Sequence, residues 1–586
     1  MKALEVQDLK VQYHTDTGKI PAVRGISFSV DKGETVGIVG GSGSGKTTAM
    51  LAVMGLLGEK AQVSAAKMEI CGEIPQPGKN VAMIFQDSMN CLNPSMKIGV
   101  QITETLRTRR GYGRKEARRR ALELLDLAGI RNGELRMGQY PSQLSGGMRQ
   151  RVVIAIALAC EPELIIADEP TTALDTAVQA QILLLLRQVV LETGAGLLLV
   201  SHDLGVTASL CSRVCVMRAG ELIESGSVED IFYSPVQEYT KQLLRDAGGR
   251  NYALPAEERE LFLKIRHLTK KYEAGEGLQD VSLEIRRGEM FALVGESGSG
   301  KTTLARILSG ILRPDGGQIL YHSLTSEKGR ENTAQIQMVF QDPYASLNPR
   351  LTAGETLTEA LGAYRKRDRR ACRKQVEEML ELTGLDRRDA DRYPWELSGG
   401  QRQRLGIARA LMVEPELLIC DEALSSLDPS ARVQILELLM DLQRKRKIAC
   451  LFISHDIQTV SRLGGRTGVM YMGRLVECGE TKEVCFDPWH PYTKMLIQAA
   501  PKPDPLRAGR MKSVPSRENE SRGFPGNGAG QTDGCPFANQ CGYAMDCCRT
   551  QQPGIYTFGG RSVSCFLYSE EHSGKRSANY RMTSQI

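Results

Sequence analysis

Two nearly identical glycine-rich stretches carry the residues best suited to bind nucleotide phosphates. They are GGSGSGKTT, Gly40 to Thr48, and GESGSGKTT, Gly295 to Thr303, and both match the GxxxxGK[ST] pattern of a phosphate loop. Glycines let backbone N–H groups turn toward phosphate oxygens at a helix N-terminus, where a lysine adds positive charge and a threonine hydroxyl can bind Mg²⁺. The expected phosphate-binding residues are Gly40, Ser42, Gly43, Ser44, Gly45, Lys46, Thr47 and Thr48, with Gly295, Ser297, Gly298, Ser299, Gly300, Lys301, Thr302 and Thr303.

Two acidic pairs follow short apolar runs that predict buried strands. The run LIIADEP carries Asp168 and Glu169, and LLICDEA carries Asp421 and Glu422. A carboxylate at the carboxyl edge of a sheet, beside a phosphate loop, suits the Mg²⁺ shell, and the next carboxylate can polarise an attacking water as a general base. The alternative, a surface acidic pair, is disfavoured by the buried-strand context, so we expect Glu169 and Glu422 to be catalytic.

A histidine and a glutamine recur in both copies. His202 and His455 directly follow the motifs VS and IS at the ends of apolar runs. One such histidine is more simply a strand cap, but two in matching constellations favour contact with a γ-phosphate, as catalytic residues. Gln86 and Gln341 can place an amide oxygen on Mg²⁺ or on water. The expected Mg²⁺ ligands are Thr47, Gln86, Asp168, Thr302, Gln341 and Asp421.

An aromatic residue precedes each loop as well. Tyr13 lies 33 positions before Lys46, and Tyr272 lies 29 positions before Lys301. Core packing is the commoner role for such a residue. Because both halves supply one, stacking on adenine is the alternative that we expect.

Every motif occurs twice, in the same order and at nearly the same spacing. The loop lysine and the glutamine are 40 positions apart in both copies, and the aspartate and the histidine are 34 apart. Such a repeat predicts two tandem domains. We expect domains at 1–246 and 261–500, a polar linker at 247–260, and a flexible tail with a cysteine cluster at 501–586.

Strands and helices must bring these residues together. The runs ETVGIVG and EMFALVG predict buried strands that enter the loops, and LIIAD, LLICD, LLLVSH and ACLFISH predict further buried strands. Helical patterns such as IGVQITETL and ALELLDLAGI separate the glutamine from a later LSGG motif. The predicted fold class is α/β, with two tandem P-loop NTPase domains that each contain an inserted helical subdomain, and a small cysteine-containing C-terminal segment.

Composition narrows the class of protein. Charged residues make up 25% of the 586 residues and hydrophobic ones 41%, and the net charge of +6 gives no reason to expect nucleic-acid binding. The N-terminus has no signal-peptide pattern, and the longest apolar runs are too short to cross a bilayer. We therefore expect a cytosolic protein with reduced cysteines, and any membrane spans to come from other chains.

Taken together, these motifs resemble the ATP-binding cassette superfamily, whose signature is LSGG followed by a sequence such as QRQR. The signatures here are LSGGMRQR, with Met148 in place of the usual glutamine, and LSGGQRQR. In that family two cassettes pair head to tail around two ATP molecules with Mg²⁺. The resemblance implies that Ser145, Gly146 and Gly147 face the ATP held by Lys301. In the same way it implies that Ser398, Gly399 and Gly400 face the ATP held by Lys46.

Finer motifs resemble the ATPases of oligopeptide, dipeptide and nickel importers. They are an LNP after each glutamine, EPTTALD from Glu169, and HPYTKMLIQAAP from His490, with SPVQEYT as its weaker counterpart in the first half. The resemblance implies an ATPase that is peripheral on the cytoplasmic face of the cell membrane. Its partners would be two permease subunits and an extracytoplasmic solute-binding protein for peptide, glutathione or a nickel chelate. A twin-cassette ATPase acting on ribosomes or DNA, and the ATPase of an exporter, are the alternatives.

Five of the fifteen cysteines crowd between Cys535 and Cys565. The gaps between Cys535, Cys541, Cys548 and Cys565 are five, six and sixteen residues, which suits zinc poorly. Four thiolates suit an iron–sulfur cluster, and related importer ATPases carry a [4Fe–4S] cluster on a similar tail, whose pattern leaves Cys547 spare. A zinc site and a merely cysteine-rich loop are the alternatives.

Two arginine-rich stretches lie at corresponding places in the helical subdomains. They are RTRRGYGRKEARRR from Arg107 and RKRDRRACRK from Arg365. A solvated helix face is the simpler interpretation, and contact with anionic lipid is the alternative.

Overall fold

The chain folds into two compact units. The computed structural model describes residues 1–15, 18–86, 91–172, 174–248, 259–272, 277–322, 336–364, 369–424, 427, 429–508 and 534–569. The first unit is Met1–Gly249 with Asp428–Ser430 and Pro501–Val514, and the second is Arg250–Leu427 with Ala431–Ala500 and Pro515–Ile586. Most of the expected linker, 249–258, lies outside the described residues, so the boundaries at 246 and 260 stay a prediction.

A six-stranded sheet forms the centre of the first unit, in the order β10-β9-β3-β8-β7-β6. Strands β3, β7 and β8 are buried at every residue, which explains their uninterrupted apolar sequences. All pairs are parallel except β9 with β10. The strands are β3 (Thr35–Val39), β6 (Val81–Ile84), β7 (Leu164–Asp168), β8 (Gly196–Val200), β9 (Arg213–Arg218) and β10 (Glu221–Ser227).

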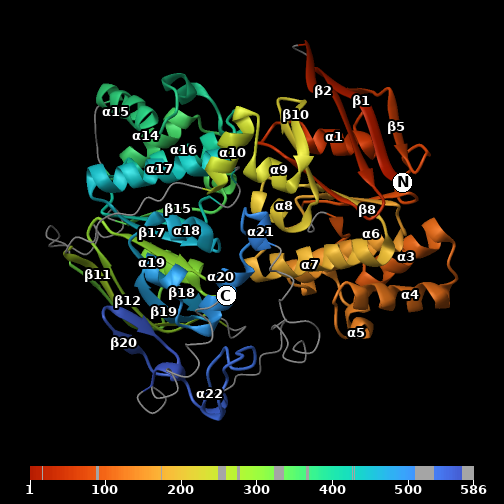
Figure 1. Ribbon diagram of the computed structural model, residues 1–586. Coiled ribbons are helices and arrows are strands. Elements are labelled where there is room, and N and C mark those ends of the chain that lie inside the picture. The colour runs from red at the N-terminus through yellow and green to blue at the C-terminus, as the bar shows by residue number, and fades with distance from the viewer. Residues whose placement is uncertain are drawn as a thin grey trace. The chain divides into compact units, whose positions relative to one another are not determined.

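A smaller antiparallel sheet and a set of helices complete this unit (Figure 1). The sheet has β1 at its centre, paired with β2, β4 and β5. Its strands are β1 (Lys2–Thr15), β2 (Gly18–Asp31), β4 (Ala61–Ser64) and β5 (Lys67–Ile70). The helices are α1 (Lys46–Val53), α3 (Ile98–Arg110), α4 (Arg114–Leu127), α5 (Gly133–Met137), α6 (Gly146–Ala159), α7 (Thr176–Thr193), α8 (Leu204–Leu210), α9 (Val228–Tyr233), α10 (Glu238–Gly248) and α21 (Pro505–Ala508).

The inserted helical subdomain consists of α3, α4 and α5, between β6 and the LSGG motif. In α4 the buried residues Ala117, Ala121, Leu124 and Leu125 follow a helical period, so this face packs inward. The arginines of the first arginine-rich stretch fall at the end of α3 and on the other faces of α4. Much of the second such stretch lies outside the described residues.

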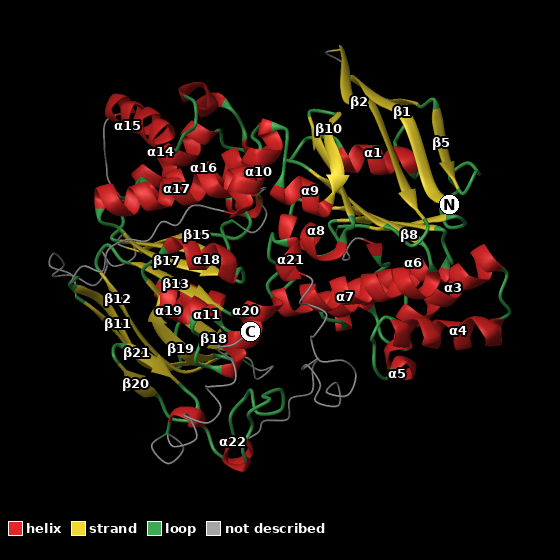
Figure 2. Cartoon of the chain, in the orientation of Figure 1, coloured by secondary structure: helices red, strands yellow, loops and turns green. Residues whose placement is uncertain are grey.

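The second unit repeats this plan with two additional strands (Figure 2). Its main sheet has the order β15-β16-β17-β13-β18-β19-β21-β20, and its smaller sheet has the order β12-β11-β14. The strands are β11 (Leu261–Lys270), β12 (Leu278–Arg286), β13 (Met290–Val294), β14 (Gly316–Tyr321), β15 (Ile336–Val339), β16 (Leu417–Asp421), β17 (Ala449–Ser454), β18 (Arg466–Tyr471), β19 (Arg474–Glu480), β20 (Tyr556–Phe558) and β21 (Arg561–Val563).

Helices occupy equivalent places in this unit. They are α11 (Lys301–Leu308), α13 (Pro343–Ser346), α14 (Ala353–Tyr364), α15 (Arg369–Leu382), α16 (Gly399–Leu411), α17 (Pro429–Arg446), α18 (Ile457–Leu463), α19 (Thr481–Phe486), α20 (Pro491–Ala499) and α22 (Asp546–Thr550). Within the part of the chain that the structure describes, no helix combines the length and the apolar sequence needed to cross a bilayer. The predicted fold class, with its buried strands and inserted helices, is confirmed.

The cysteine segment, residues 534–569, is folded onto the second unit, which corrects the expectation that the cysteines lie on a flexible tail. Strand β21 pairs with β19 at the edge of the main sheet. A fully buried ion pair joins the two strands, because Arg561 lies 2.6 Å from Glu477. Glu477 also accepts hydrogen bonds from the backbone N–H groups of Trp489 and His490, at the start of α20. The expected tether before the cysteines, 509–533, lies outside the described residues.

Replacing Arg561 with methionine is expected to destabilise the second unit by about 3–5 kcal/mol, because Glu477 would remain buried without an opposite charge. Thermal and denaturant unfolding measure the effect. The control is Lys374→Met, which removes one side of an exposed ion pair with Glu378 and should cost less than about 1 kcal/mol. Equal stability of both variants would contradict a structural role for the buried pair.

Candidate nucleotide sites

The phosphate loops require glycine because the backbone is crowded there. A Cβ on Gly40 would lie 2.2 Å from the carbonyl oxygen of Met217, and one on Gly45 would lie 2.5 Å from that of Ala22. In the second unit a Cβ on Gly295 would lie 2.2 Å from the carbonyl oxygen of Met470. Each loop joins a buried strand, β3 or β13, to a helix that begins at its lysine. This is the arrangement that presents backbone N–H groups to an anion.

Both loop lysines are buried and bonded to their own loop. Lys46 Nζ donates to the carbonyl oxygens of Gly40 and Gly41, both at 2.9 Å. Lys301 Nζ donates to those of Gly295 and Glu296, both at 2.7 Å. Each ammonium group therefore lies inside the loop. A phosphate oxygen that enters the loop can replace the carbonyl oxygens as the hydrogen-bond acceptor of the lysine.

The aspartates lie where the buried strands β7 and β16 end. Burial raises the pKa of Asp168 and of Asp421, and a hydrogen bond from the threonine of the neighbouring phosphate loop opposes this shift. In the second unit Thr302 Oγ1 donates to Asp421 Oδ1 at 3.2 Å. The structure thus brings a carboxylate and a hydroxyl together beside each loop, the oxygen ligands that Mg²⁺ prefers.

The glutamates that follow have an unusual backbone. Glu169 and Glu422 have φ values of 48° and 47°, in the left-handed region that residues other than glycine rarely adopt. The N–H of Glu169 donates to the carbonyl of Val200, on the neighbouring strand β8, and that of Glu422 donates to the carbonyl of Ile453 on β17. Strained backbone held by its surroundings is typical of functional residues.

Each glutamate carboxylate is held by the predicted histidine and glutamine. Glu169 Oε1 lies 2.8 Å from His202 Nδ1, and its Oε2 accepts from Gln86 Nε2 at 2.8 Å. Thr172, which the sequence analysis did not select, donates to the same Oε2. Burial alone would raise the pKa of Glu169, but the interactions with His202, Thr172 and Lys46 together outweigh it, so the pKa lies below the ordinary value. The carboxylate is therefore charged at neutral pH.

The second unit repeats this group with a looser histidine contact. Glu422 Oε2 accepts from Gln341 Nε2 at 2.9 Å and lies 3.4 Å from His455 Nδ1. Its pKa is also lowered, because the interactions with His455 and Lys301 together outweigh the effect of burial. Each unit therefore contains one complete set of phosphate loop, aspartate, glutamate, glutamine and histidine.

The signature serines cap helices α6 and α16. Ser145 Oγ accepts from the N–H of Met148, and Ser398 Oγ accepts from the N–H of Gln401. Gln401 also returns a bond, since its Oε1 accepts from the N–H of Ser398 at 2.9 Å. A methionine side chain has no strong acceptor for this second bond, so the first signature is held by one bond fewer.

The two tyrosines expected at adenine differ in their surroundings. Tyr13 lies on β1 and packs, partly buried, against the apolar core of the first unit. Tyr272 follows β11 and is 41% exposed. Stacking of either on adenine stays a prediction.

Two other tyrosines contact the phosphate loops directly, and the sequence analysis did not assign them this role. Tyr239 Oη accepts from the N–H of Gly41 at 2.9 Å, and Tyr492 Oη accepts from the N–H of Glu296 at 3.0 Å. The available signal was the Tyr-Thr pair shared by QEYT and HPYT, in matching places of the two halves.

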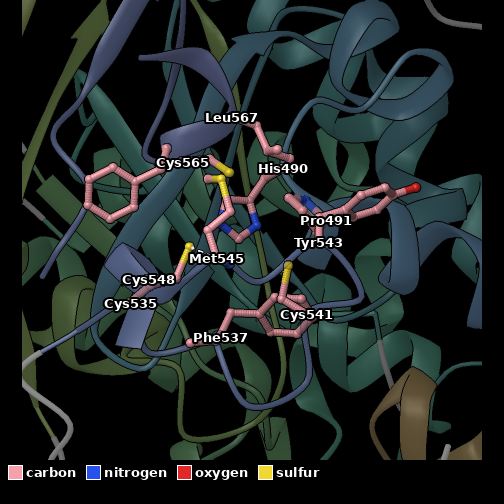
Figure 3. A pocket seen from close by; sticks show the side chains of 12 residues that line it. His490, Pro491, Cys535, Phe537, Cys541, Tyr543, Met545, Cys548, Cys565 and Leu567 are labelled. Atoms are coloured by element: carbon pink, nitrogen blue, oxygen red, sulfur yellow. Dashed lines mark hydrogen bonds between the residues drawn. The ribbon is translucent and has the colours of Figure 1, made fainter. Parts of the chain in front are cut away.

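Four of the five clustered cysteines line one pocket of the second unit, beside the imidazole of His490 (Figure 3). They are Cys535, Cys541, Cys548 and Cys565, whereas Cys547 is not among the lining residues. Burial raises the pKa of Cys541 to about 11, and burial keeps His490 neutral by lowering its pKa to about 3. Among the described residues, no group of three or more Cys, His, Asp or Glu side chains lies close enough together to bind a metal ion.

Comparison with known proteins gives matches along most of the chain. The ABC transporter family profile matches residues 23–172 and 278–425, and the profile described as "Oligopeptide/dipeptide transporter, C-terminal region" matches 476–548. The glutathione import ATP-binding protein GsiA of Salmonella paratyphi A (strain ATCC 9150 / SARB42) is 41% identical over an alignment of 562 residues, and the match covers 86% of this chain and 90% of that protein. GsiA of Escherichia coli (strain K12) matches with the same identity and coverage.

One of the solved structures that match most of the chain extends over both units. It is the complex of the archaeal ribosome recycling factor aABCE1 with the ribosomal stalk protein aP1, and it covers 79% of this chain and 89% of that chain with a TM-score of 0.56. Because the sequence identity is only 21%, this likeness shows the twin-cassette fold alone. The profile matches and the identity of 41% to import ATP-binding proteins show that the chain belongs to the ABC transporter family, as an ATP-hydrolysing subunit.

Proposed function

We propose that this chain hydrolyses ATP to energise the import of a peptide-like solute across a membrane. The solute would be glutathione, a dipeptide, an oligopeptide or a nickel chelate. The observation that supports ATP hydrolysis best is the complete catalytic set in each unit. Import is supported by the relatives, which are glutathione import ATP-binding proteins, and by the match to the oligopeptide/dipeptide transporter region.

The first unit illustrates the roles that we propose. Lys46 and the loop N–H groups bind the β- and γ-phosphates, while Thr47, Gln86 and Asp168 would hold Mg²⁺, which supplies positive charge between the phosphates. Glu169 accepts a proton from the attacking water, because its carboxylate is charged and lies partly buried next to His202.

In the second unit the same roles fall to the equivalent residues. Lys301 binds phosphate, Thr302, Gln341 and Asp421 would hold Mg²⁺, and Glu422 is the base beside His455. We propose that the other phosphate-loop residues contact phosphate and that the two tyrosines named for adenine contact adenine, as the sequence predicts.

Head-to-tail pairing of the two cassettes is proposed from the family. The N-terminus of α6, with Ser145, Gly146 and Gly147, would then contact the γ-phosphate held by the second loop. The N-terminus of α16, with Ser398, Gly399 and Gly400, would contact the one held by the first. Helix N-termini favour such an anion because their N–H groups are not bonded within the helix.

The proposed partners are two membrane-embedded permease subunits and an extracytoplasmic solute-binding protein, with the chain bound peripherally at the cytoplasmic face of the membrane. Closure of the cassettes on ATP would move the permeases, and hydrolysis would reopen them. A role on ribosomes is less well supported, since the likeness to a ribosome recycling factor extends only to the fold.

Replacing Glu169 or Glu422 with glutamine is expected to lower ATP turnover at the altered site by about a hundredfold or more, through loss of the general base. The double variant should fall to the background rate. The measurement is phosphate release, together with ATP binding, which should be retained because the substitution is isosteric.

The control for this experiment is Glu59→Gln, at an exposed glutamate of the same unit as Glu169. It should hydrolyse ATP at the parental rate. Parental turnover of the double variant would show that neither carboxylate acts as the base.

Affinity purification from solubilised membranes is expected to recover two multi-span permease chains, with a solute-binding protein when its solute is added. The partners can be identified by mass spectrometry. Recovery with ribosomes or DNA instead would contradict the transport proposal, and permeases without any binding protein would favour an exporter.

We also propose that Cys535, Cys541, Cys548 and Cys565 hold a [4Fe–4S] cluster. The donor set fits in kind and number, because four thiols line one enclosed pocket and the fifth cysteine does not. Burial raises the pKa of the Cys535, Cys541 and Cys565 thiols, so these three are neutral when no metal is bound and ligation would displace their protons. The cluster would supply redox-active iron or structural cross-linking to the segment.

Anaerobically purified protein is expected to be brown and to absorb near about 400 nm, as thiolate-ligated iron does. Cys541→Ser should lose this band, whereas the matched control Cys547→Ser should keep it. Iron and sulfide analysis gives the stoichiometry. A colourless protein with one zinc would replace the cluster with a zinc site, and loss of the band in Cys547→Ser alone would reassign the ligands.

A further inference from the structure

One tyrosine connects the cysteine segment to the second phosphate loop. Tyr492 is fully buried, and its hydroxyl accepts the hydrogen bond from the N–H of Glu296. Its ring centroid lies 5.6 Å from that of Phe537, between Cys535 and Cys541 in the chain, and 4.5 Å from that of Tyr471. The three rings therefore form a continuous apolar contact from the cysteine segment to the loop.

Tyr471 binds the cysteine segment too. Its ring meets Phe537 edge-on at 5.5 Å, and its hydroxyl accepts from Gln540 Nε2 at 3.3 Å. Tyr471 and Phe537 are each 3% exposed, so this contact is tightly enclosed. Movement or loss of Phe537 would leave space directly beside Tyr492, and packed interiors transmit such changes.

The described residues of the first unit are arranged differently at the equivalent place. The strand sequences RVCVMR of β9 and RTGVMY of β18 correspond, so Arg218 occupies the place of Tyr471. The guanidinium of Arg218 lies 5.0 Å from the ring centroid of Tyr239, which is only partly buried. The tyrosine-to-loop bond is thus common to both units, but support by the cysteine segment is specific to the second.

The residue that the tyrosine holds is also bonded to the loop lysine. Glu296 donates its N–H to Tyr492 and accepts at its carbonyl from Lys301 Nζ. These bonds fix the two peptide groups on either side of the Glu296 Cα, which limits how far the loop and its lysine can shift before a phosphate binds. A preorganised loop binds its ligand more tightly, because less ordering remains to be done on binding.

We propose that the cysteine segment raises the nucleotide affinity of the second phosphate loop through Phe537 and Tyr492, and has no such effect on the first. Tyr492 is a positioning residue, since it acts on the loop and not on the nucleotide. This inference rests on the proposed function insofar as the Lys301 loop must bind nucleotide.

The experiment measures Mg-ADP affinity separately at each loop, by calorimetry on the full chain. Lys46→Ala removes Mg-ADP binding at the first loop, so that only binding at the second is measured. Lys301→Ala does the reverse. In the Lys46→Ala background, Tyr492→Phe and Phe537→Ala should each weaken binding about threefold to tenfold, the effect of losing one backbone hydrogen bond or its support. In the Lys301→Ala background, neither should change affinity, whereas Tyr239→Phe should weaken it to a similar degree.

Two further variants distinguish this coupling from a general loss of structure in the cysteine segment. Phe558→Ala removes an aromatic ring of the same cysteine segment that contacts Trp489, and it should leave both affinities unchanged. Phe537→Leu keeps an apolar side chain and should recover much of the loss. Unchanged affinity in Phe537→Ala, or equal weakening at both loops, would overturn the inference. Absence of ADP binding in both single-lysine backgrounds and in the parent would instead contradict the proposed function.

Discussion

The need to hold a phosphate loop open is the constraint on which the rest of each unit depends. Its backbone N–H groups must point toward an anion and so cannot be used in a helix or sheet. The surroundings therefore fix the loop by other means. These are the close approach of the Met217 or Met470 carbonyl, the lysine bonds to loop carbonyls, and the tyrosine bond to one N–H.

The same constraint accounts for the buried parallel sheet. Strands that run side by side deliver their last residues to one edge, so Asp168 and Asp421 arrive beside their loops without further support. The glutamates then turn away from the strand direction, with φ near 48°. Hydrogen bonds to the histidine and the glutamine hold each glutamate in this strained turn. The position of the glutamate therefore depends on the neighbouring strand and on the loop after β6 or β15.

The two units share the residues that we propose to be catalytic and differ in the residues around them. The second has a reciprocal serine–glutamine cap at its signature helix, two added strands and an aromatic cluster beside its loop. The first has a methionine at the cap and an arginine over its loop tyrosine. The two proposed nucleotide sites therefore contain the same kinds of reacting groups. They differ in the residues that hold the phosphate loop and the signature helix in place.

The sequence by itself determined the repeated motifs and the buried strands, and it supplied the residues that we propose for both catalytic sets. It could do so because phosphate chemistry depends on a few residue types at fixed local spacing, and because burial leaves a periodic apolar pattern. The sequence also showed that Met148 stands in place of the usual glutamine, but it did not show how this affects the cap of the signature helix. Only the tertiary structure decided contacts between distant residues: Tyr239 with Gly41, Tyr492 with Glu296, and Arg561 with Glu477. It also showed that the cysteine segment is folded, and it places Cys548 and not its neighbour Cys547 at the pocket, as the resemblance to importer ATPases implied. These features arise from packing between elements far apart in the chain, which leaves no local pattern to read.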